Sequence, residues 1–83
     1  MKINVKYFAS FRERIGTGSE SIDTKAATLG ALRDELIARG GAHAESLARG
    51  RAVRVALDQV IRDEATPLTE GAEVAFFPPV TGG

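Results

Sequence analysis

The stretch KINVKYF, residues 2–8, decides how this chain is expected to fold. Ile3, Val5 and Tyr7 alternate with polar residues, which is typical of a strand with one buried face. A second strong strand pattern, EVAFF, occupies residues 73–77 near the other end of the chain. Because a helix is predicted between them, we expect the two strands to be parallel neighbours at the centre of one sheet.

The spacing of leucines between these two strands predicts the main helix. Its apolar face is formed by three residues at helical spacing, Leu29, Leu32 and Leu36. Thr28 is the expected N-cap. Arg39 is expected in the last turn, where a cation interacts favourably with the helix dipole. The glycine pair at residues 40–41 is expected to end the helix.

A short helix is expected directly after the first strand. Ser10 and Glu13 have the spacing of a capping box, and Phe11 and Ile15 would share one helical face. Gly16 is expected to end this helix, because glycine readily adopts the left-handed conformation of a C-cap.

Three weaker strands complete the predicted sheet. One spans residues 18–23 and would return alongside the first strand. Another spans residues 53–57, and a tight turn at residues 58–59 would lead into a short strand at residues 60–61. For the strands at residues 53–57 and 60–61, the sequence pattern gives no pairing partner.

The order of elements predicts an α+β protein with the β-grasp, ubiquitin-like fold, in which a mixed sheet packs on one main helix. The 83 residues are enough for one small domain. We expect this domain to span residues 1–77 and residues 78–83 to form an extended, flexible C-terminal tail.

Composition excludes several classes of function. Eleven basic residues balance eleven acidic ones, which argues against binding to nucleic acid or to an anionic membrane. No apolar run approaches the ~20 residues of a membrane span, and the N-terminus lacks the apolar stretch of a signal peptide. We therefore expect a cytoplasmic protein with no nucleic-acid or membrane partner.

The residues of a stand-alone active site are also missing. The chain has no cysteine, so it offers no thiol nucleophile and no thiolate metal site, and no metal site is predicted. The single histidine, His43, is expected to be a solvated surface residue. The acidic side chains are expected to solvate the surface, among them Glu13, Asp23, Asp34, Glu35, Asp58 and Glu73. Whether the protein is part of an enzyme is left open, because it has no active site of its own.

The C-terminal tail, FFPPVTGG, is the most informative segment. Strand alternation places Val74 and Phe76 on one face, so Phe77 is expected on the other face as an exposed docking residue. The two prolines at residues 78–79 end the strand and stiffen an extended exit. Six residues from there to the end reach roughly 20 Å at ~3.3 Å per residue. The terminal Gly-Gly has no side chains, so it could thread a narrow channel.

Two segments carry a resemblance to a known family. EVAFFPPVTGG, residues 73–83, and KYFASFRERIG, residues 6–16, resemble the ubiquitin-like sulfur-carrier family, in particular the small subunits of molybdopterin synthase. The leucine-rich helix stands at a similar position between them, so the resemblance covers nearly the whole chain. The Gly-Gly end is common to ubiquitin-like carriers, whereas FFPPVTGG is much more specific.

The resemblance implies that the Gly83 carboxylate is the reactive group. A separate ubiquitin-activating-like adenylyltransferase would use ATP to convert it into an acyl-adenylate, and sulfur would then replace one oxygen to give a thiocarboxylate. The sulfur would be donated to cyclic pyranopterin monophosphate in the large subunit, within a heterotetramer. No cofactor would be bound by this chain itself. An adenylate is a good leaving group, and the missing cysteine fits a carrier that holds sulfur at its C-terminus.

The resemblance also assigns binding roles. The tail residues expected to insert into the large subunit are Pro78, Pro79, Val80, Thr81 and Gly82. The apolar residues expected to dock beside the tail are Phe8, Ile61 and Phe77. Of these, only Phe77 is also indicated by strand alternation.

Three alternatives remain open at this stage. The chain could be a carrier of the same fold that serves thiamine synthesis or another thiolation pathway. It could be a protein modifier that is conjugated to lysines through Gly83. It could also be a binding module whose tail is passive.

Overall fold

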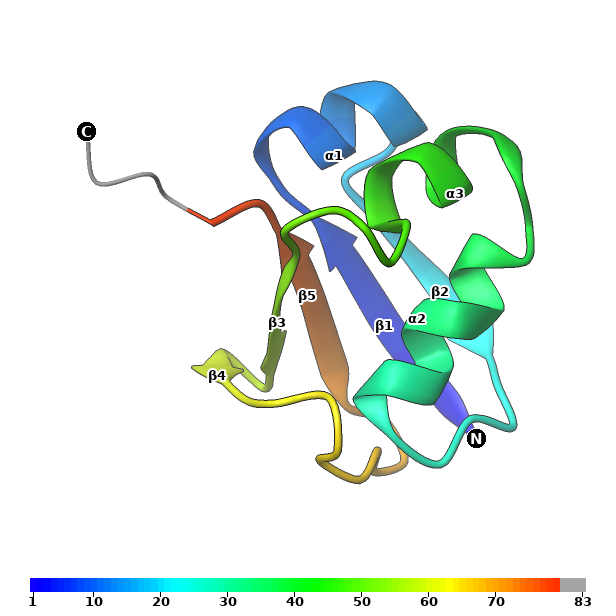
Figure 1. The fold of residues 1–83 in the computed structure, drawn as a ribbon. Coiled ribbons are helices and arrows are strands. Elements are labelled where there is room, and N and C mark those ends of the chain that lie inside the picture. Colours follow the sequence, from blue (N-terminus) through cyan, green and yellow to red (C-terminus); the bar gives the residue numbers. More distant parts are fainter. Residues whose placement is uncertain (80–83) are drawn as a thin grey trace.

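Two parallel strands lie at the centre of the sheet, as the sequence predicts. In this computed structural model, which describes residues 1–79, β1 (Lys2–Tyr7) pairs in parallel with β5 (Glu73–Phe77). Asn4 stands opposite Glu73, and Tyr7 stands opposite Phe76. The two strands therefore finish at the same end of the sheet (Figure 1).

Antiparallel strands extend the sheet on both sides to give the order β2-β1-β5-β3-β4. These strands are β2 (Ser19–Asp23), β3 (Arg54–Leu57) and β4 (Val60–Ile61). The helices are α1 (Ala9–Ile15), α2 (Leu29–Ile37) and α3 (Gly41–Leu47). This arrangement is the predicted β-grasp fold, with the weak strands in their predicted places.

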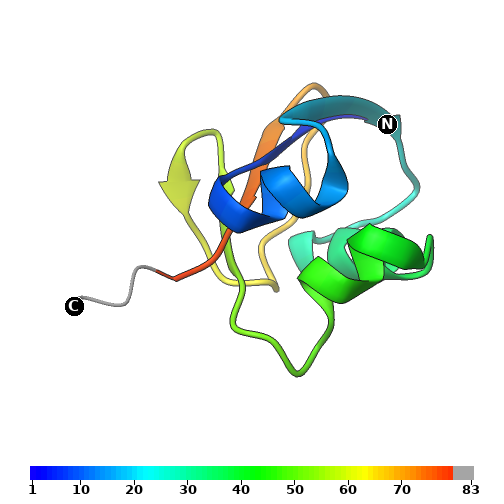
Figure 2. The same ribbon diagram turned by 90° about the horizontal axis from the view of Figure 1, so that it is seen from above.

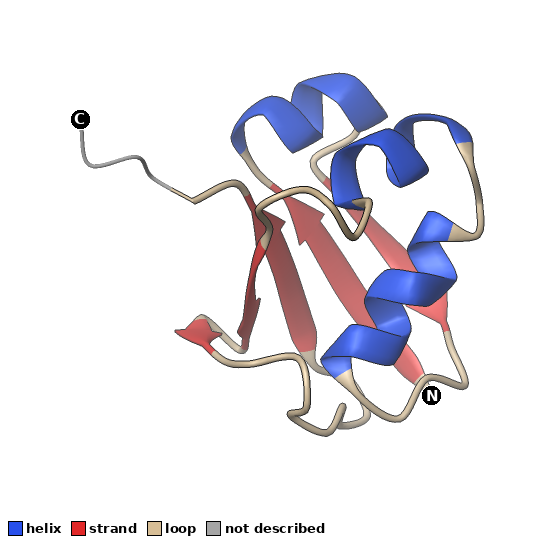
Figure 3. Cartoon of the chain, in the orientation of Figure 1, coloured by secondary structure: helices blue, strands red, loops and turns tan. Residues whose placement is uncertain are grey.

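The helices leave one face of the sheet open. Helices α2 and α3 lie in front of one face, and α1 lies at the end where β1 and β5 finish (Figures 1 and 3). The view from above shows α2 and α3 on the same side of the sheet (Figure 2). No helix within residues 1–79 covers the other face, and none of the helices there is long and apolar enough to cross a membrane.

The core fills the space between the sheet and α2. The buried side chains that form it include the predicted residues of both central strands and of the main helix, Ile3, Val5, Tyr7, Leu29, Leu32, Leu36, Val74 and Phe76. Phe11 from α1 and Leu47 from α3 close the end of this core. The strand and helix periodicities predicted from the sequence are therefore confirmed.

The capping box predicted for α1 is wrong. The helix begins at Ala9, and its N-cap is Phe8, whose side chain makes no capping hydrogen bond. The reason is that the backbone N–H of Phe8 still donates to Phe76 O at 3.2 Å, so the strand pairing continues to this residue. Ser10 then lies inside the helix and cannot cap it. The predicted stop at Gly16 is confirmed, with φ 91°.

The end of α2 also differs from the prediction. The Thr28 cap is confirmed, because its hydroxyl accepts from Ala31 N at 3.1 Å. The helix ends at Ile37, however, and Arg39 lies beyond it. The N–H groups of Arg39 and Gly40 donate to the carbonyls three residues back, which tightens and finishes the last turn early. The glycine pair instead makes the left-handed entry into α3, with φ values of 75° and 54°.

A buried arginine fastens the long loop before β5 to α2. The side chain of Arg33 is only 6% exposed, and its guanidinium donates to Leu47 O, Ala48 O and Glu64 Oε2, each at 2.7 Å. Arg49 also binds Glu64. These bonds satisfy the buried cation and hold the segment that connects β4 to β5.

The β3–β4 turn provides a test of backbone strain. Asp58 and Gln59 have φ values of 48° and 70°, as a two-residue type I′ hairpin requires. Glycine adopts this conformation without steric cost, so Gln59→Gly should raise the free energy of unfolding by roughly 0.5–1 kcal/mol. Gln59→Ala keeps the strain and is the matched control. Urea unfolding that gives equal or lower stability for Gln59→Gly than for Gln59→Ala would contradict this prediction.

Candidate functional site

The root of the tail coincides with the end of the central strand pair. Phe8 follows β1 and is 46% exposed, although its backbone is hydrogen-bonded to Phe76 of β5. Phe77 ends β5 one residue later. Because the two strands are parallel, both aromatic residues stand where the chain leaves the sheet (Figure 1).

A strip of small apolar residues continues from this point across the open face. Ala75 of β5 stands opposite Ala56 of β3, and Ala56 stands opposite Ile61 of β4. Residues opposite one another across strands share a face of the sheet. Both alanines are only 6% exposed but lie outside the core cluster, whereas Ile61 is 60% exposed. We call the set Phe8, Ala56, Ile61, Ala75 and Phe77 the open-face patch.

Phe77 lies on the predicted face but is not fully exposed. Val74 and Phe76 belong to the core cluster and Phe77 does not, which confirms the predicted alternation. Phe77 is nevertheless half-buried, so the prediction of a large exposed aromatic is corrected. It stands directly opposite Arg54 of β3, and strand neighbours on the same face cover part of each other.

The structure describes only the first part of the tail. Pro78 and Pro79 are half-buried and follow the end of β5 (Figure 1). The predicted insertion residues Val80, Thr81 and Gly82 and the predicted reactive residue Gly83 lie outside the described residues.

Two features of this end were not predicted from the sequence. Val60, beside Ile61, is 50% exposed, and Arg54 is exposed next to Phe77. The strand pattern predicted that residues 53–57 and 60–61 were strands, but it gave no partner for either. Only the register of β3 with β5 shows which side chains adjoin the tail root.

A polar cluster formed by Tyr7, Glu20, Arg39 and His43 lies on the β2 side of β1, away from β5. Its geometry corrects the prediction for His43. This histidine is not a solvated surface residue: its side chain is 19% exposed, its Nε2 lies 3.0 Å from Glu20 Oε2, and its ring meets Tyr7 edge-on. Tyr7 donates its hydroxyl to Glu20 Oε2 at 2.7 Å, and Arg39 donates to Glu20 Oε1 at 2.8 Å. The cluster ties α3 and the turn that follows α2 to the β2 edge of the sheet.

The electrostatics of this cluster favour an ionised Glu20. Burial by itself would raise the pKa of Glu20, but hydrogen bonds from Arg39, His43 and Tyr7 outweigh it and lower the pKa to about 2. Burial and the bond to Glu20 raise the pKa of Tyr7 above its usual value. All four groups are used in binding one another, which makes the cluster a structural fastening.

Three of the acidic groups predicted to solvate the surface also have partners within residues 1–79. Asp34 binds Arg49 at 2.9 Å, Glu73 binds Lys6 at 3.2 Å, and Glu35 accepts from Thr24. Within residues 1–79, no three histidine or acidic side chains come together as a metal site.

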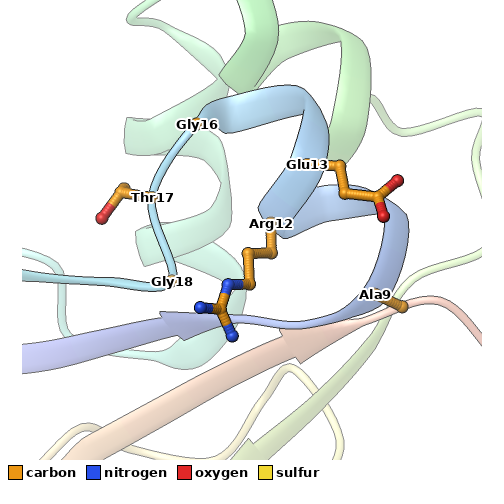
Figure 4. A pocket seen from close by; sticks show the side chains of 6 residues that line it. All are labelled: Ala9, Arg12, Glu13, Gly16, Thr17 and Gly18. Carbon is orange, nitrogen blue, oxygen red and sulfur yellow. The ribbon is translucent and has the colours of Figure 1, made fainter.

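A shallow depression lies beside α1. It is lined by Ala9, Arg12, Glu13, Gly16, Thr17 and Gly18. Figure 4 shows the side chains of Arg12 and Glu13 pointing to different sides of it. The depression therefore brings together no acid–base pair, and the open-face patch remains the stronger candidate site.

A mixed five-stranded sheet folded on one main helix, with its central strand leading into the C-terminal segment, defines a ubiquitin-like β-grasp protein. The chain belongs to the ThiS family, whose profile matches residues 5–83. This membership confirms the family relationship expected from the sequence.

Similar proteins place the chain within this family. It is 41% identical to the molybdopterin synthase sulfur carrier subunit of Escherichia coli, over 98% of this chain and 99% of that protein. SAMP1 of Haloferax volcanii is 26% identical over the whole of both chains, with a TM-score of 0.79. A chain from the complex of subunits 1 and 2 of the Helicobacter pylori molybdopterin-converting factor is 28% identical over the whole of both chains, with a TM-score of 0.70.

The Glu20 cluster predicts how stability depends on pH. The pKa of Glu20 is lowered from 4.5 to about 2 in the folded protein, so its stabilisation is present above pH 4.5 and is lost as the pH falls toward 2. Glu20→Gln should therefore be less stable than wild type at pH 7, by roughly 2 kcal/mol because the site is partly solvated. The difference should shrink at low pH.

Urea unfolding at several pH values measures this difference. Glu45→Gln removes the same charge from an exposed position on α3 and is the matched control. A stability difference between Glu20→Gln and wild type that stays constant from neutral to acid pH would contradict the assignment.

Proposed function

We propose that this chain is the sulfur carrier subunit of a molybdopterin synthase and docks its large subunit through the open-face patch. The observation that carries the proposal is the position of this patch at the root of the tail. Its two exposed apolar side chains, Phe8 and Ile61, are typical of a protein-binding site. Its place next to the exit of β5 allows one partner to hold the patch and to receive the tail at the same time. The name of the similar Escherichia coli protein supports the same function.

The proposed chemistry takes place at Gly83. In an activating enzyme, the Gly83 carboxylate would attack the α-phosphate of ATP and release pyrophosphate. A sulfur donor would then displace AMP from the acyl-adenylate and leave a thiocarboxylate. Mixed anhydrides of this kind make a weak carboxylate electrophile reactive. ATP is consumed by the activating enzyme, and this chain binds no cofactor of its own.

The proposed acceptor is cyclic pyranopterin monophosphate in the large subunit. The thiocarboxylate sulfur would form the new carbon–sulfur bond there, and water would release the chain with its carboxylate restored. Two donations would complete one dithiolene, which fits a heterotetramer with two carrier chains. Similarity to a chain solved in a complex of two molybdopterin-converting subunits supports a large-subunit partner.

The roles of individual residues follow from their places. Phe8, Ile61 and Phe77 would form the apolar contact, with the two buried alanines as its floor. Pro78 and Pro79 would direct the chain away from β5, because proline has no N–H with which to continue the ladder. The five residues from Pro78 to Gly82 would insert into the partner and bring Gly83 to its active site.

A second candidate function is protein modification. The specific observation in its favour is the similarity to SAMP1, a small archaeal modifier protein. In that case the activated Gly83 would form an amide with a lysine. An amide-linked adduct in cell lysate would favour modification, and co-purification with a large synthase subunit would favour molybdopterin synthesis over thiamine or another thiolation pathway.

The sulfur chemistry is tested by intact mass. After incubation with the activating enzyme, ATP and a sulfide source, the chain should gain the mass difference of one oxygen replaced by sulfur. A chain that lacks Gly83 is the control and should not change. An unchanged mass, with an enzyme preparation proven active on another carrier, would count against the sulfur-carrier function.

Docking is tested separately with Phe77→Ala and the purified large subunit. Removal of this aromatic should leave the fold intact, because Phe77 lies outside the core, and should weaken binding by about 1–2 kcal/mol, roughly 10-fold. Calorimetric titration measures the affinity, and circular dichroism checks the fold. Lys25→Ala, at an exposed position between β2 and α2, is the control. Unchanged affinity of Phe77→Ala would remove this residue from the interface.

A further inference from the structure

Charge is unevenly distributed over this chain, although its formal net charge is zero. Five exposed arginines make no side-chain hydrogen bond or ion pair within residues 1–79; they lie on α1, on β3 or in the segments next to β3 and β4. We call them the basic rim: Arg12, Arg14, Arg51, Arg54 and Arg62. Most other cations, such as Arg33, Arg39 and Arg49, are used in the internal pairs described above.

Hydrogen bonds and strand register place the basic rim. Arg54 stands directly opposite Phe77, and the backbone N–H of Arg62 donates to Val55 O at 3.1 Å. Arg51 belongs to the segment that leads into β3. Arg12 and Arg14 lie on α1, which begins directly after Phe8 and lies at the end where β5 finishes (Figure 1). Cations thus stand on both sides of the open-face patch.

Two acidic groups without a cation lie at the other end of the sheet. Glu70 accepts from Lys2 N at 2.8 Å, where β1 begins. Asp58 accepts from Glu73 N at 2.9 Å, where β5 begins. These two carboxylates bind backbone N–H groups and pair with none of the basic-rim arginines within residues 1–79. Glu13 on α1 and Asp63, which directly follows Arg62, are acidic residues near the basic rim, so this end is predominantly rather than entirely cationic.

We propose that the basic rim steers the tail end of this chain onto a protein surface whose apolar docking site is bordered by acidic residues, with Arg54 making a direct ion pair at that border. The proposal deepens the proposed function, and the partner it commits to is the large synthase subunit. An apolar centre with a charged border is the ordinary anatomy of a protein–protein interface. The exposed Ile61 beside the arginines favours a protein partner over a nucleic acid, because binding to phosphates requires no apolar side chain there.

The arrangement has a specific kinetic consequence. Opposite charges around two docking sites raise the rate of productive encounter, because the field orients the molecules before they touch. Arg54 is well suited to a direct contact, since its guanidinium can bind a carboxylate with two parallel hydrogen bonds. The open-face patch, in contrast, acts only after contact and should control dissociation.

The test is the association rate of the full chain with the purified large subunit, measured by stopped flow at low and high salt. Arg54→Glu should slow association roughly 10-fold at low salt and change dissociation much less. The same variant should show a weaker salt dependence than wild type, because four arginines of the basic rim remain. Arg51→Glu added to Arg54→Glu should slow association further.

Lys25→Glu is the matched control, because it makes the same change in net charge far from the tail root. Lys25 follows Thr24, whose N–H donates to Met1 O at the opposite end of the sheet. We expect its association rate to stay within about twofold of wild type. An equal effect of Lys25→Glu and Arg54→Glu would overturn the proposal, as would faster association of Arg54→Glu.

The outcomes separate this inference from the proposed function. If wild type binds, and Phe77→Ala raises the dissociation rate while Arg54→Glu associates like wild type, the steering role is wrong and the docking function stands. If the folded wild-type chain does not bind the large subunit at all, the proposed function fails and the steering proposal fails with it.

Discussion

The parallel pairing of β1 with β5 is the constraint on which the rest of the structure depends. Parallel strands begin and end together, so Phe8 and Phe77 arrive at the same end of the sheet even though 69 positions separate them in the sequence. An antiparallel pairing would put Phe8 at the end opposite to the tail. The same pairing places both strands inside the sheet, where their alternate residues form the core. One choice of strand direction therefore fixes the core and the candidate site together.

Hydrogen bonds and ion pairs stabilise the helix-covered side of the sheet, and no helix within residues 1–79 covers the open face (Figure 3). Glu20 joins Tyr7, Arg39 and His43, and the guanidinium of Arg33 satisfies three acceptors around α2. Both sites are partly buried, where an unpaired charge would be costly, so their geometry is narrowly determined. They hold α2, α3 and the loop before β5 against the sheet. Rigidity is thus supplied from one face, and the other face is available for a partner.

Local patterns in the sequence predict the elements but not their partners. The alternation of Ile3, Val5 and Tyr7 and the helical spacing of the leucines reflect burial on one face, so strands and helix were predicted where the structure has them. The capping box failed because a long-range strand bond to Phe8 sets the start of α1. His43 was misjudged because Glu20, 23 residues away, meets it only after folding. The sequence did not predict that Ala56 and Ala75 belong to the open-face patch for the same reason, since an alanine in a strand does not indicate which residues pack beside it.

The proposed role requires both fast association and fast dissociation. The open-face patch and the basic rim meet these two requirements separately. A carrier that visits an activating enzyme and then an acceptor enzyme must find each partner quickly and leave each one. A large apolar interface would slow dissociation, because buried area and packed anchors mainly control how long a complex lasts. Charge at the border of the interface raises the association rate but adds little to the lifetime of the complex, since exposed ion pairs are weak. A small apolar patch beside arginines that form no ion pair within residues 1–79 is therefore the arrangement that physical chemistry favours for a protein that hands on its cargo and departs.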